Sequence, residues 1–320
     1  MLAVTAVALA LPRPGLAAHV AATIHVHGQA SGIATGAGSV WVGSDGSQTI
    51  SRISPTTNRI TAGRISTHEF AVDALAASTG GVLLDRSMRR LDPATNQVGP
   101  PTLPGSTCGQ PQLAGDATGS VWYLNTYASS SSCPFLAQYD SSTGKIVQRW
   151  GHVIPANSDA SLAVGDGQVW IVVNDGQRLT LYRFDPQTGS ARVIRRQRGN
   201  TYALAVGDGV AALLTDLSAY GLAPRIALTR ISDASLRPLG TTSLPVRDIA
   251  SLAEGGQRLW AGVTLDRQHR RNVVETFNVQ TGRRVGATAS LGPNDFNDEL
   301  TYGLGALWVA ANYRVVKITS

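Results

Sequence analysis

A short glycine–tryptophan motif recurs along most of the 320-residue chain, and this repeat restricts the possible folds. One copy reads Gly-Asp-Gly-Gln-Val-Trp-Ile at residues 165–171. Seven copies align on the tryptophan position, which is occupied in turn by Trp41, Leu83, Trp122, Trp170, Ala212, Trp260 and Trp308. Successive copies are 42, 39, 48, 42, 48 and 48 residues apart. A period of about 44 residues is typical of four-stranded propeller blades and disfavours helical solenoids.

A second signal, a turn of the Asp-Pro-Gln-Thr-Gly type, follows the tryptophan position in six copies. These turns occupy residues 54–58, 92–96, 140–144, 185–189, 232–235 and 278–282. Asp, Asn or Ser at the first position can bond the backbone two residues on, and a closing Gly or Asn tolerates positive φ. Apolar and polar residues alternate on both sides of the turns, so each turn is predicted to join two antiparallel strands.

Each repeat therefore predicts four strands, which we call A to D. In the fourth copy, strand A covers residues 161–164 and strand B contains Trp170. The seventh copy ends at Ser320 without a fourth strand, whereas residues 23–27 form a spare alternating segment before the first copy. We expect this segment to pair with residues 314–318 and to close the ring, which hides sheet edges. The predicted fold is all-β, a seven-bladed β-propeller of four-stranded antiparallel blades.

The N-terminal segment resembles a secretory signal. Residues 1–11 are nearly all apolar and are followed by a small-residue run at 15–18, although a basic start is absent. We expect residues 1–18 to be this signal and residues 19–320 to be a single propeller domain. The mature chain would then be secreted or held in the periplasm or cell envelope. No later stretch approaches the roughly 20 apolar residues of a membrane span.

Cys108 and Cys133 are the only cysteines. An even number of cysteines in an exported chain is consistent with one disulfide. In a propeller, the loops from strand D to the next strand A and the loops from B to C open on the same face, and the two cysteines fall in one loop of each kind. We therefore predict a Cys108–Cys133 disulfide, with two unpaired thiols as the alternative.

The same face is predicted to carry any ligand site, because the starts of the seven A strands converge there around the axis. We call this opening the funnel mouth. The residues expected at it are polar: Asp73, Asp159, Asn200, Tyr202, Arg247, Asp248 and Glu299. Such a rim suits a polar or cationic small molecule, a peptide, a sugar or a protein better than a lipid. The alternative is that hydrated strand ends surround a water-filled axis.

Charge and histidine patterns give no strong sign of nucleic-acid or metal chemistry. The chain has 27 basic and 21 acidic residues, a net charge of +6, with arginines clustered at residues 192–198. No aromatic platform accompanies this cluster, so a solvated outer strand is favoured over nucleic-acid binding. His25 and His27 alternate and could share a face as two metal ligands, but such pairs are more often ordinary surface. No motif identifies a catalytic residue, a metal or a cofactor, and we expect a monomer.

Two units resemble those of bacterial YVTN-type propellers and the related streptogramin-lyase-like propellers. They are Gly-Ala-Gly-Ser-Val-Trp-Val at residues 36–42 and Ile-Ser-Pro-Thr-Thr-Asn at residues 53–58. The resemblance covers nearly the whole chain and implies a seven-bladed ring. Its virginiamycin B lyase-like members imply a carbon–oxygen lyase that uses magnesium and a site with histidines and a Glu-x-His pair.

This chain contains no Glu-x-His, so the resemblance transfers no catalytic residue to it. We therefore expect a ligand- or protein-binding scaffold rather than an enzyme. The alternative is a lyase-like or other metal-assisted enzyme that acts on a small polar or peptide-like substrate.

Overall fold

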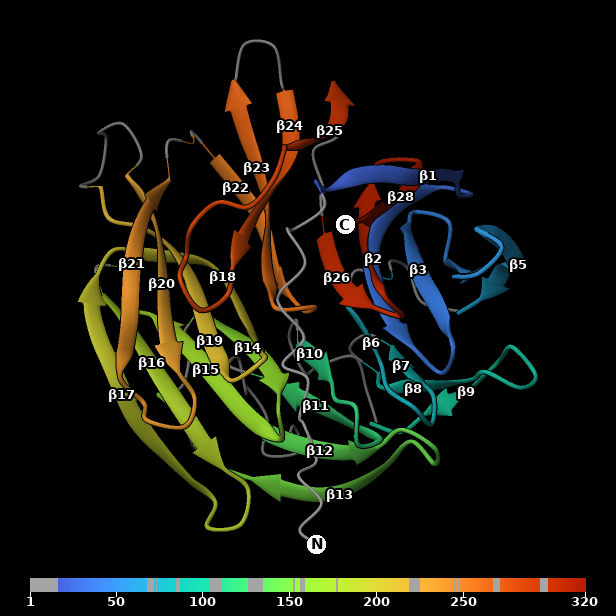
Figure 1. Cartoon of the computed structure of the whole chain (residues 1–320). Helices are drawn as coiled ribbons and strands as arrows, with labels where there is room; N and C mark the ends of the chain where they lie inside the picture. The colour runs from blue at the N-terminus through green and yellow to red at the C-terminus, as the bar shows by residue number, and fades with distance from the viewer. Residues whose placement is uncertain are drawn as a thin grey trace, which may run out of the picture.

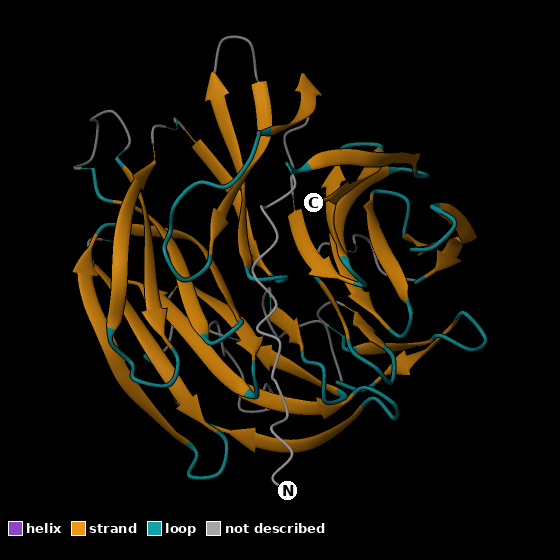
Figure 2. Cartoon of the chain, viewed as in Figure 1, coloured by secondary structure: helices purple, strands orange, loops and turns teal. Residues whose placement is uncertain are grey.

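The protein forms a ring of seven β-sheets around a central axis (Figure 1). The computed structural model describes residues 17–67, 72, 74–84, 87–103, 111–125, 135–151, 153–155, 159–176, 178–218, 225–244, 246, 248–266, 271–293 and 299–320. These residues form 28 strands in seven four-stranded antiparallel sheets, and Figure 2 shows strands and loops but no helix among them. The predicted seven-bladed β-propeller is confirmed. We number the blades 1 to 7 along the chain.

The first four blades each use four consecutive strands, from the axis outward. Blade 1 consists of β2 (Gln29–Gly36), β3 (Ser39–Asp45), β4 (Thr49–Ser54) and β5 (Arg59–Ser66). Blade 2 consists of β6 (Leu75–Ala77), β7 (Val82–Leu84), β8 (Arg89–Asp92) and β9 (Gln97–Pro101). Blade 3 consists of β10 (Gln112–Gly115), β11 (Ser120–Leu124), β12 (Leu136–Asp140) and β13 (Lys145–Trp150). Blade 4 consists of β14 (Asp159–Gly165), β15 (Gln168–Asn174), β16 (Arg178–Asp185) and β17 (Ser190–Arg198).

The last three blades continue the ring. Blade 5 consists of β18 (Asn200–Gly207), β19 (Val210–Asp216), β20 (Ile226–Ser232) and β21 (Pro238–Leu244). Blade 6 consists of β22 (Asp248–Glu254), β23 (Arg258–Asp266), β24 (Arg271–Asn278) and β25 (Ala289–Pro293). Blade 7 consists of β26 (Glu299–Gly303), β27 (Ala306–Ala311), β28 (Arg314–Thr319) and β1 (His19–His25). The inner strands β2, β6, β10, β14, β18, β22 and β26 contact one another in turn and enclose a central channel.

The two ends of the chain complete blade 7 together. β1 pairs antiparallel with β28, with Ile24 opposite Val315, and the two strands lie side by side in Figure 1. This pairing confirms the predicted closure of the ring by the N-terminal strand. Closure pairs the outer edge of β28, which would otherwise present unpaired backbone groups to solvent.

The bounds of β1 correct one detail of the sequence interpretation. The strand begins earlier than predicted and ends at His25, so His27 does not alternate with His25 on a strand. The His27 Nδ1 atom instead lies 3.3 Å from a guanidinium nitrogen of Arg64. The strand geometry that would let the two histidines act as paired metal ligands is therefore not formed.

The repeated tryptophans lie between blades. Trp41, Trp170, Trp260 and Trp308 are fully buried. In three of them the indole Nε1 donates a hydrogen bond to the first glycine carbonyl of the preceding turn, as from Trp41 to Gly36 O at 3.0 Å. This burial agrees with the prediction that the tryptophans form inter-blade core, because a large aromatic side chain buries both apolar area and its one polar group.

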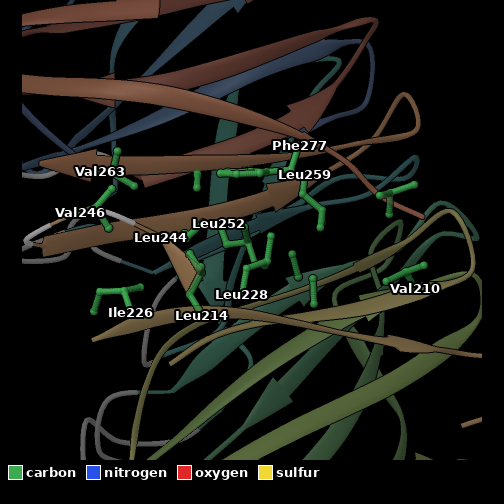
Figure 3. Close-up of a cluster of buried hydrophobic side chains, with 14 of the residues drawn as sticks. Val210, Leu214, Ile226, Leu228, Leu244, Val246, Leu252, Leu259, Val263 and Phe277 are labelled. Carbon is green, nitrogen blue, oxygen red and sulfur yellow. The ribbon is translucent and has the colours of Figure 1, made fainter. Parts of the chain in front are cut away.

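Aliphatic side chains fill the remaining space between neighbouring blades. Figure 3 shows the cluster between blades 5 and 6, where Leu214 and Leu228 lie near Leu252, and Val263 belongs to the same cluster. All four side chains are at least nine-tenths buried. Each Å² of apolar surface removed from water contributes about 25 cal/mol to the free energy of folding. The interfaces between blades are therefore the main stabilising contribution to the ring.

The turn between strands A and B explains the two glycines of the motif. A side chain on Gly165 would place its Cβ only 2.2 Å from the carbonyl oxygen of Val206 in the next blade. Gly167 has φ of 72°, as the second central residue of a two-residue hairpin turn requires. The first glycine therefore permits close packing of blades, and the second permits the turn.

The arginine cluster of residues 192–198 lies on β17, the outermost strand of blade 4. Arg192, Arg196 and Arg198 are exposed, as expected for charges that protect a sheet edge. In the part of the chain that the structure describes, no helix is long and apolar enough to cross a membrane.

Candidate functional site

Four residues of the predicted funnel mouth are the first residues of inner strands. Asp159, Asn200, Asp248 and Glu299 begin β14, β18, β22 and β26 respectively. Because the inner strands are equivalent elements of one ring, their first residues lie around the same end of the channel. Asp159, Asn200 and Glu299 are exposed. The structure thus gathers these polar residues at one opening.

Two polar side chains near this opening join neighbouring blades. Glu299 Oε2 accepts a hydrogen bond of 3.2 Å from the Ile33 amide, which links blade 7 to blade 1. Asn174 Oδ1 accepts one of 3.0 Å from the Thr201 amide, which links blade 4 to blade 5. Part of the polar rim therefore also has a structural role.

The other predicted mouth residues either lie within a strand or fall outside the described residues. Tyr202 lies inside β18, where the pairing register shifts between Thr201 and Ala203. The predicted mouth residues Asp73 and Arg247 lie outside the described residues, as do both cysteines of the predicted Cys108–Cys133 disulfide.

A cavity of about 450 Å³ lies in the channel, away from the residues that begin the inner strands. Its walls come from the second half of the inner strands and from the turns between strands A and B. Every blade contributes one aliphatic side chain at the same repeat position, and we call this set the aliphatic ring: Ile33, Leu75, Leu113, Leu162, Leu204, Leu252 and Leu300. We call the end of the channel bordered by the A–B turns the turn end.

Two polar side chains stand out at the turn end. Glu254 closes β22, and Tyr302 lies in the neighbouring β26. The Tyr302 ring stacks on Trp260, with centroids 6.2 Å apart and planes at 18°. Burial raises the pKa of Glu254 to about 9, and a side-chain hydrogen bond to Asp208 and the charges of Asp208 and Asp166 act in the same direction. Glu254 is therefore protonated at neutral pH.

Sequence reasoning missed this pair because it searched the opposite opening. A comparison of equivalent positions in the repeat would have detected the pair. At the position two residues after the aliphatic ring, the seven blades carry Thr35, Ala77, Gly115, Val164, Val206, Glu254 and Tyr302. Only the last two combine a large side chain with an ionisable group, and they belong to adjacent blades.

A metal centre does not form from the residues that the structure describes. Among them, no group of three or more His, Cys, Asp or Glu side chains is arranged to hold a metal ion. The carboxyl groups at the turn end therefore do not constitute a ready coordination site.

Comparison with known proteins identifies the class of fold. No family model matches the sequence, and no curated protein matches it. Among solved structures, the ring is similar to the WD40 domain of Neurospora crassa Pan2, with a TM-score of 0.62 and 10% sequence identity. The similarity covers 91% of this chain and 89% of that chain. The protein is thus a β-propeller that resembles a WD40 domain in architecture.

This similarity shows the fold alone, because 10% identity carries no information about particular side chains. In all, 880 solved chains match the structure. The relation to the YVTN-type and streptogramin-lyase-like propellers rests on the turn and tryptophan motifs and stays a prediction.

Proposed function

We propose that this chain is a non-enzymatic binding or scaffold propeller that holds a protein, a peptide, a sugar or a polar small molecule at its funnel mouth. The observation that supports this proposal most directly is the convergence of Asp159, Asn200, Asp248 and Glu299 at the starts of four successive inner strands. A rigid ring that presents polar side chains around one opening is suited to recognition, because the scaffold loses little entropy on binding.

The charges at the mouth favour a partner that donates hydrogen bonds. Asp159 and Asn200 are exposed on adjacent blades, and a carboxylate with a neighbouring amide can receive amino, guanidinium or hydroxyl groups. A flexible polar peptide or a sugar offers such groups. A lipid chain does not.

Export to the cell envelope or the exterior is part of the proposal, and the packing of Ala18 bears on where a signal would be removed. Ala18, the last residue of the predicted signal, is only 5% exposed and packs in a cluster with Ala289 and Leu291. Cleavage before Ala18 would keep this contact, whereas cleavage after it would remove a buried methyl group. Mass spectrometry of the mature chain would identify the first residue, and an uncleaved chain retained in the cytoplasm would contradict export.

The binding proposal is tested by a screen of peptides and oligosaccharides against the parent, Asp159→Ala and Asn200→Ala. We expect each substitution to weaken a confirmed ligand about tenfold, which corresponds to about 1.4 kcal/mol. Arg196→Ala, on the outer strand β17, is the matched control and should bind like the parent. Unchanged affinity in both mouth variants would place the site elsewhere. Turnover of a cyclic depsipeptide in the presence of magnesium would instead favour the lyase-like alternative.

A further inference from the structure

The inner strands of the seven blades provide an internal comparison that singles out Glu254. The equivalent residues of blades 4 and 5 are Val164 and Val206. A valine at this position packs its side chain against the preceding blade without removing a polar group from water. Glu254 instead carries a carboxyl group that shares a hydrogen bond with the Asp208 side chain, while its Oε1 atom is buried and has no hydrogen-bond partner among the described residues. Burial of an unpartnered polar atom destabilises a fold.

The carboxyl group packs against the preceding blade at the first glycine of its A–B turn. A Cβ atom on Gly207 would lie 1.6 Å from Glu254 Oε2, so the space left by this repeated glycine, which is equivalent to Gly165, is filled by the carboxyl group. A buried carboxyl group where the two preceding blades carry valine departs from what packing alone favours, and such departures are expected at functional positions.

Two carboxylates and one guanidinium group surround Glu254 and Tyr302. Asp208 and Asp166, in the A–B turns of blades 5 and 4, act on Glu254, Asp208 through a side-chain hydrogen bond as well as its charge. The Arg258 guanidinium acts on Tyr302, and its carbon is 5.7 Å from the centroid of the Trp260 ring. Arg258 thus lies over the indole, while the carboxyl groups raise the negative potential at the turn end.

The cavity adds an apolar compartment to this charged end. The aliphatic ring and Glu254 line the same space of about 450 Å³, together with the hydroxyl-bearing residues Thr35 and Thr301. The two hydroxyl oxygens lie 3.4 Å apart. A ligand with an apolar body and one cationic head would meet a matching surface with each part.

We propose that the turn end of the channel binds a small organic ammonium ion, with its charged head at Glu254 and Tyr302 and its apolar body among the side chains of the aliphatic ring. An organic cation fits better than a metal ion, since no cluster of metal-binding side chains forms among the described residues. An ammonium group brings three hydrogen-bond donors, and a tyrosine ring attracts cations. This site is at the opposite end of the channel from the funnel mouth, so its test does not depend on the binding function proposed there.

Binding of the cation would also move a proton. Glu254 holds its proton at neutral pH, and a cation at its oxygen favours the carboxylate, so each binding event should release a proton into solution. Affinity for a permanently positive ligand should consequently rise with pH up to the pKa of about 9. A neutral ligand of the same shape should show no such dependence.

Isothermal titration calorimetry on the full chain tests the proposal with three probes that share one apolar chain: pentylammonium, pentan-1-ol and pentanoate. We expect pentylammonium to bind at least tenfold more tightly than pentan-1-ol and pentanoate to bind most weakly. Proton release is measured by repeating the titration in buffers of different ionisation enthalpy.

Two substitutions separate a binding role from a structural one. Glu254→Val introduces the residue of blades 4 and 5 and should abolish the preference for pentylammonium while raising the thermal stability. Glu254→Gln keeps the shape and should lose proton release. Asp185→Asn, in an exposed turn of blade 4, is the control and should bind like the parent. Equal binding of pentylammonium and pentan-1-ol, no binding of any probe, or undiminished binding by both Glu254 variants would overturn the proposal.

Discussion

Lys317 Nζ donates a hydrogen bond of 2.7 Å to the carbonyl oxygen of Pro55, and this contact joins the last blade of the ring to the first. The same ammonium group lies 3.1 Å from Asn58 Oδ1 in that turn and 5.1 Å from the centroid of the Trp308 ring. Lys317 is the cross-strand partner of Trp308. One lysine therefore covers a core tryptophan and bonds the neighbouring blade.

The same contact recurs around the ring. Arg52, opposite Trp41, donates to Pro93 O at 2.6 Å in the next blade. Arg90 donates to Ser141 O at 2.9 Å, and the buried Arg230 donates to carbonyls of the turn at residues 278–282. Basic residues on strand C thus link each of these blades to the Asp-Pro-type turn of its successor.

Replacement of Lys317 by methionine should loosen the closure of the ring. Methionine keeps the apolar stem over Trp308 but removes the charged donor, so we expect a loss of about 1.5–3 kcal/mol in the free energy of unfolding. Urea denaturation followed by tryptophan fluorescence measures this change. Lys145→Met, on the exposed outer strand β13, should change stability by less than about 0.5 kcal/mol. Equal effects of the two substitutions would show that the Pro55 contact contributes nothing.

A double-mutant cycle tests the fit between Gly207 and Glu254. Gly207→Ala places a methyl group 1.6 Å from Glu254 Oε2, the end of a flexible side chain that must move aside, so we expect a loss of about 1 kcal/mol, the low end of overpacking costs. In a Glu254→Ala background the same change should cost much less, because the clashing oxygen is gone. A coupling energy near zero would mean that the backbone, not the carboxyl group, makes glycine necessary at this position.

The sequence predicted the features that depend on periodicity. The tryptophan spacing gave seven blades, and the alternation at residues 23–27 gave closure by the N-terminal strand. The blade count depends on a local pattern that repeats, and the closure follows because the seventh copy lacks a fourth strand that the spare N-terminal segment can supply. The first residue of β1 could not be predicted from the local sequence, because His19 is in a strand only through its pairing with Thr319 of β28.

Contacts between blades could not be predicted in the same way. The bond from Lys317 to Pro55 joins residues far apart in the sequence, and nothing in the local pattern around Lys317 indicates its acceptor. Glu254 was missed for a related reason, because its environment comes from Gly207 and Tyr302 in the two flanking blades. A comparison of equivalent repeat positions would have detected it, since a carboxyl group departs from the valines of blades 4 and 5.

The first A–B turn offers a stabilising substitution. Ala37 has φ of 47° and Gly38 has φ of 70°, so both central residues of this hairpin turn are in the left-handed region. An alanine there is strained, whereas asparagine tolerates this conformation and Asn-Gly is the preferred pair. Ala37→Asn should raise the free energy of unfolding by about 0.5 kcal/mol. Differential scanning calorimetry would detect the higher Tm, and Ala37→Val, with a branched side chain, should lower it.

Closure by β1 can be tested within one strand. Ile24 is 7% exposed and packs in a cluster with Trp308 and Val315, whereas Val20 on the same strand is 41% exposed. Ile24→Ala should cost about 2–5 kcal/mol, and Val20→Ala should cost less than about 1 kcal/mol. Deletion of residues 19–28 should be at least as costly as Ile24→Ala, because it unpairs the whole edge of β28. A deletion variant as stable as the parent would show that ring closure is not needed.

The titration of Glu254 should make the stability of the fold depend on pH. Burial, with Asp208 and Asp166 nearby, raises its pKa from 4.5 to about 9, so the folded state holds a proton that the unfolded state releases between these values. Stability should therefore fall as pH rises through this window. Glu254→Gln removes the titrating group, and its Tm should fall less steeply than that of the parent between about pH 5 and 9. The Asp185→Asn control should affect only the acid side, because the Gln187 amide and the Thr188 hydroxyl hold the pKa of Asp185 below its usual value. Parallel Tm profiles for Glu254→Gln and the parent would show that Glu254 is ionised in the folded chain.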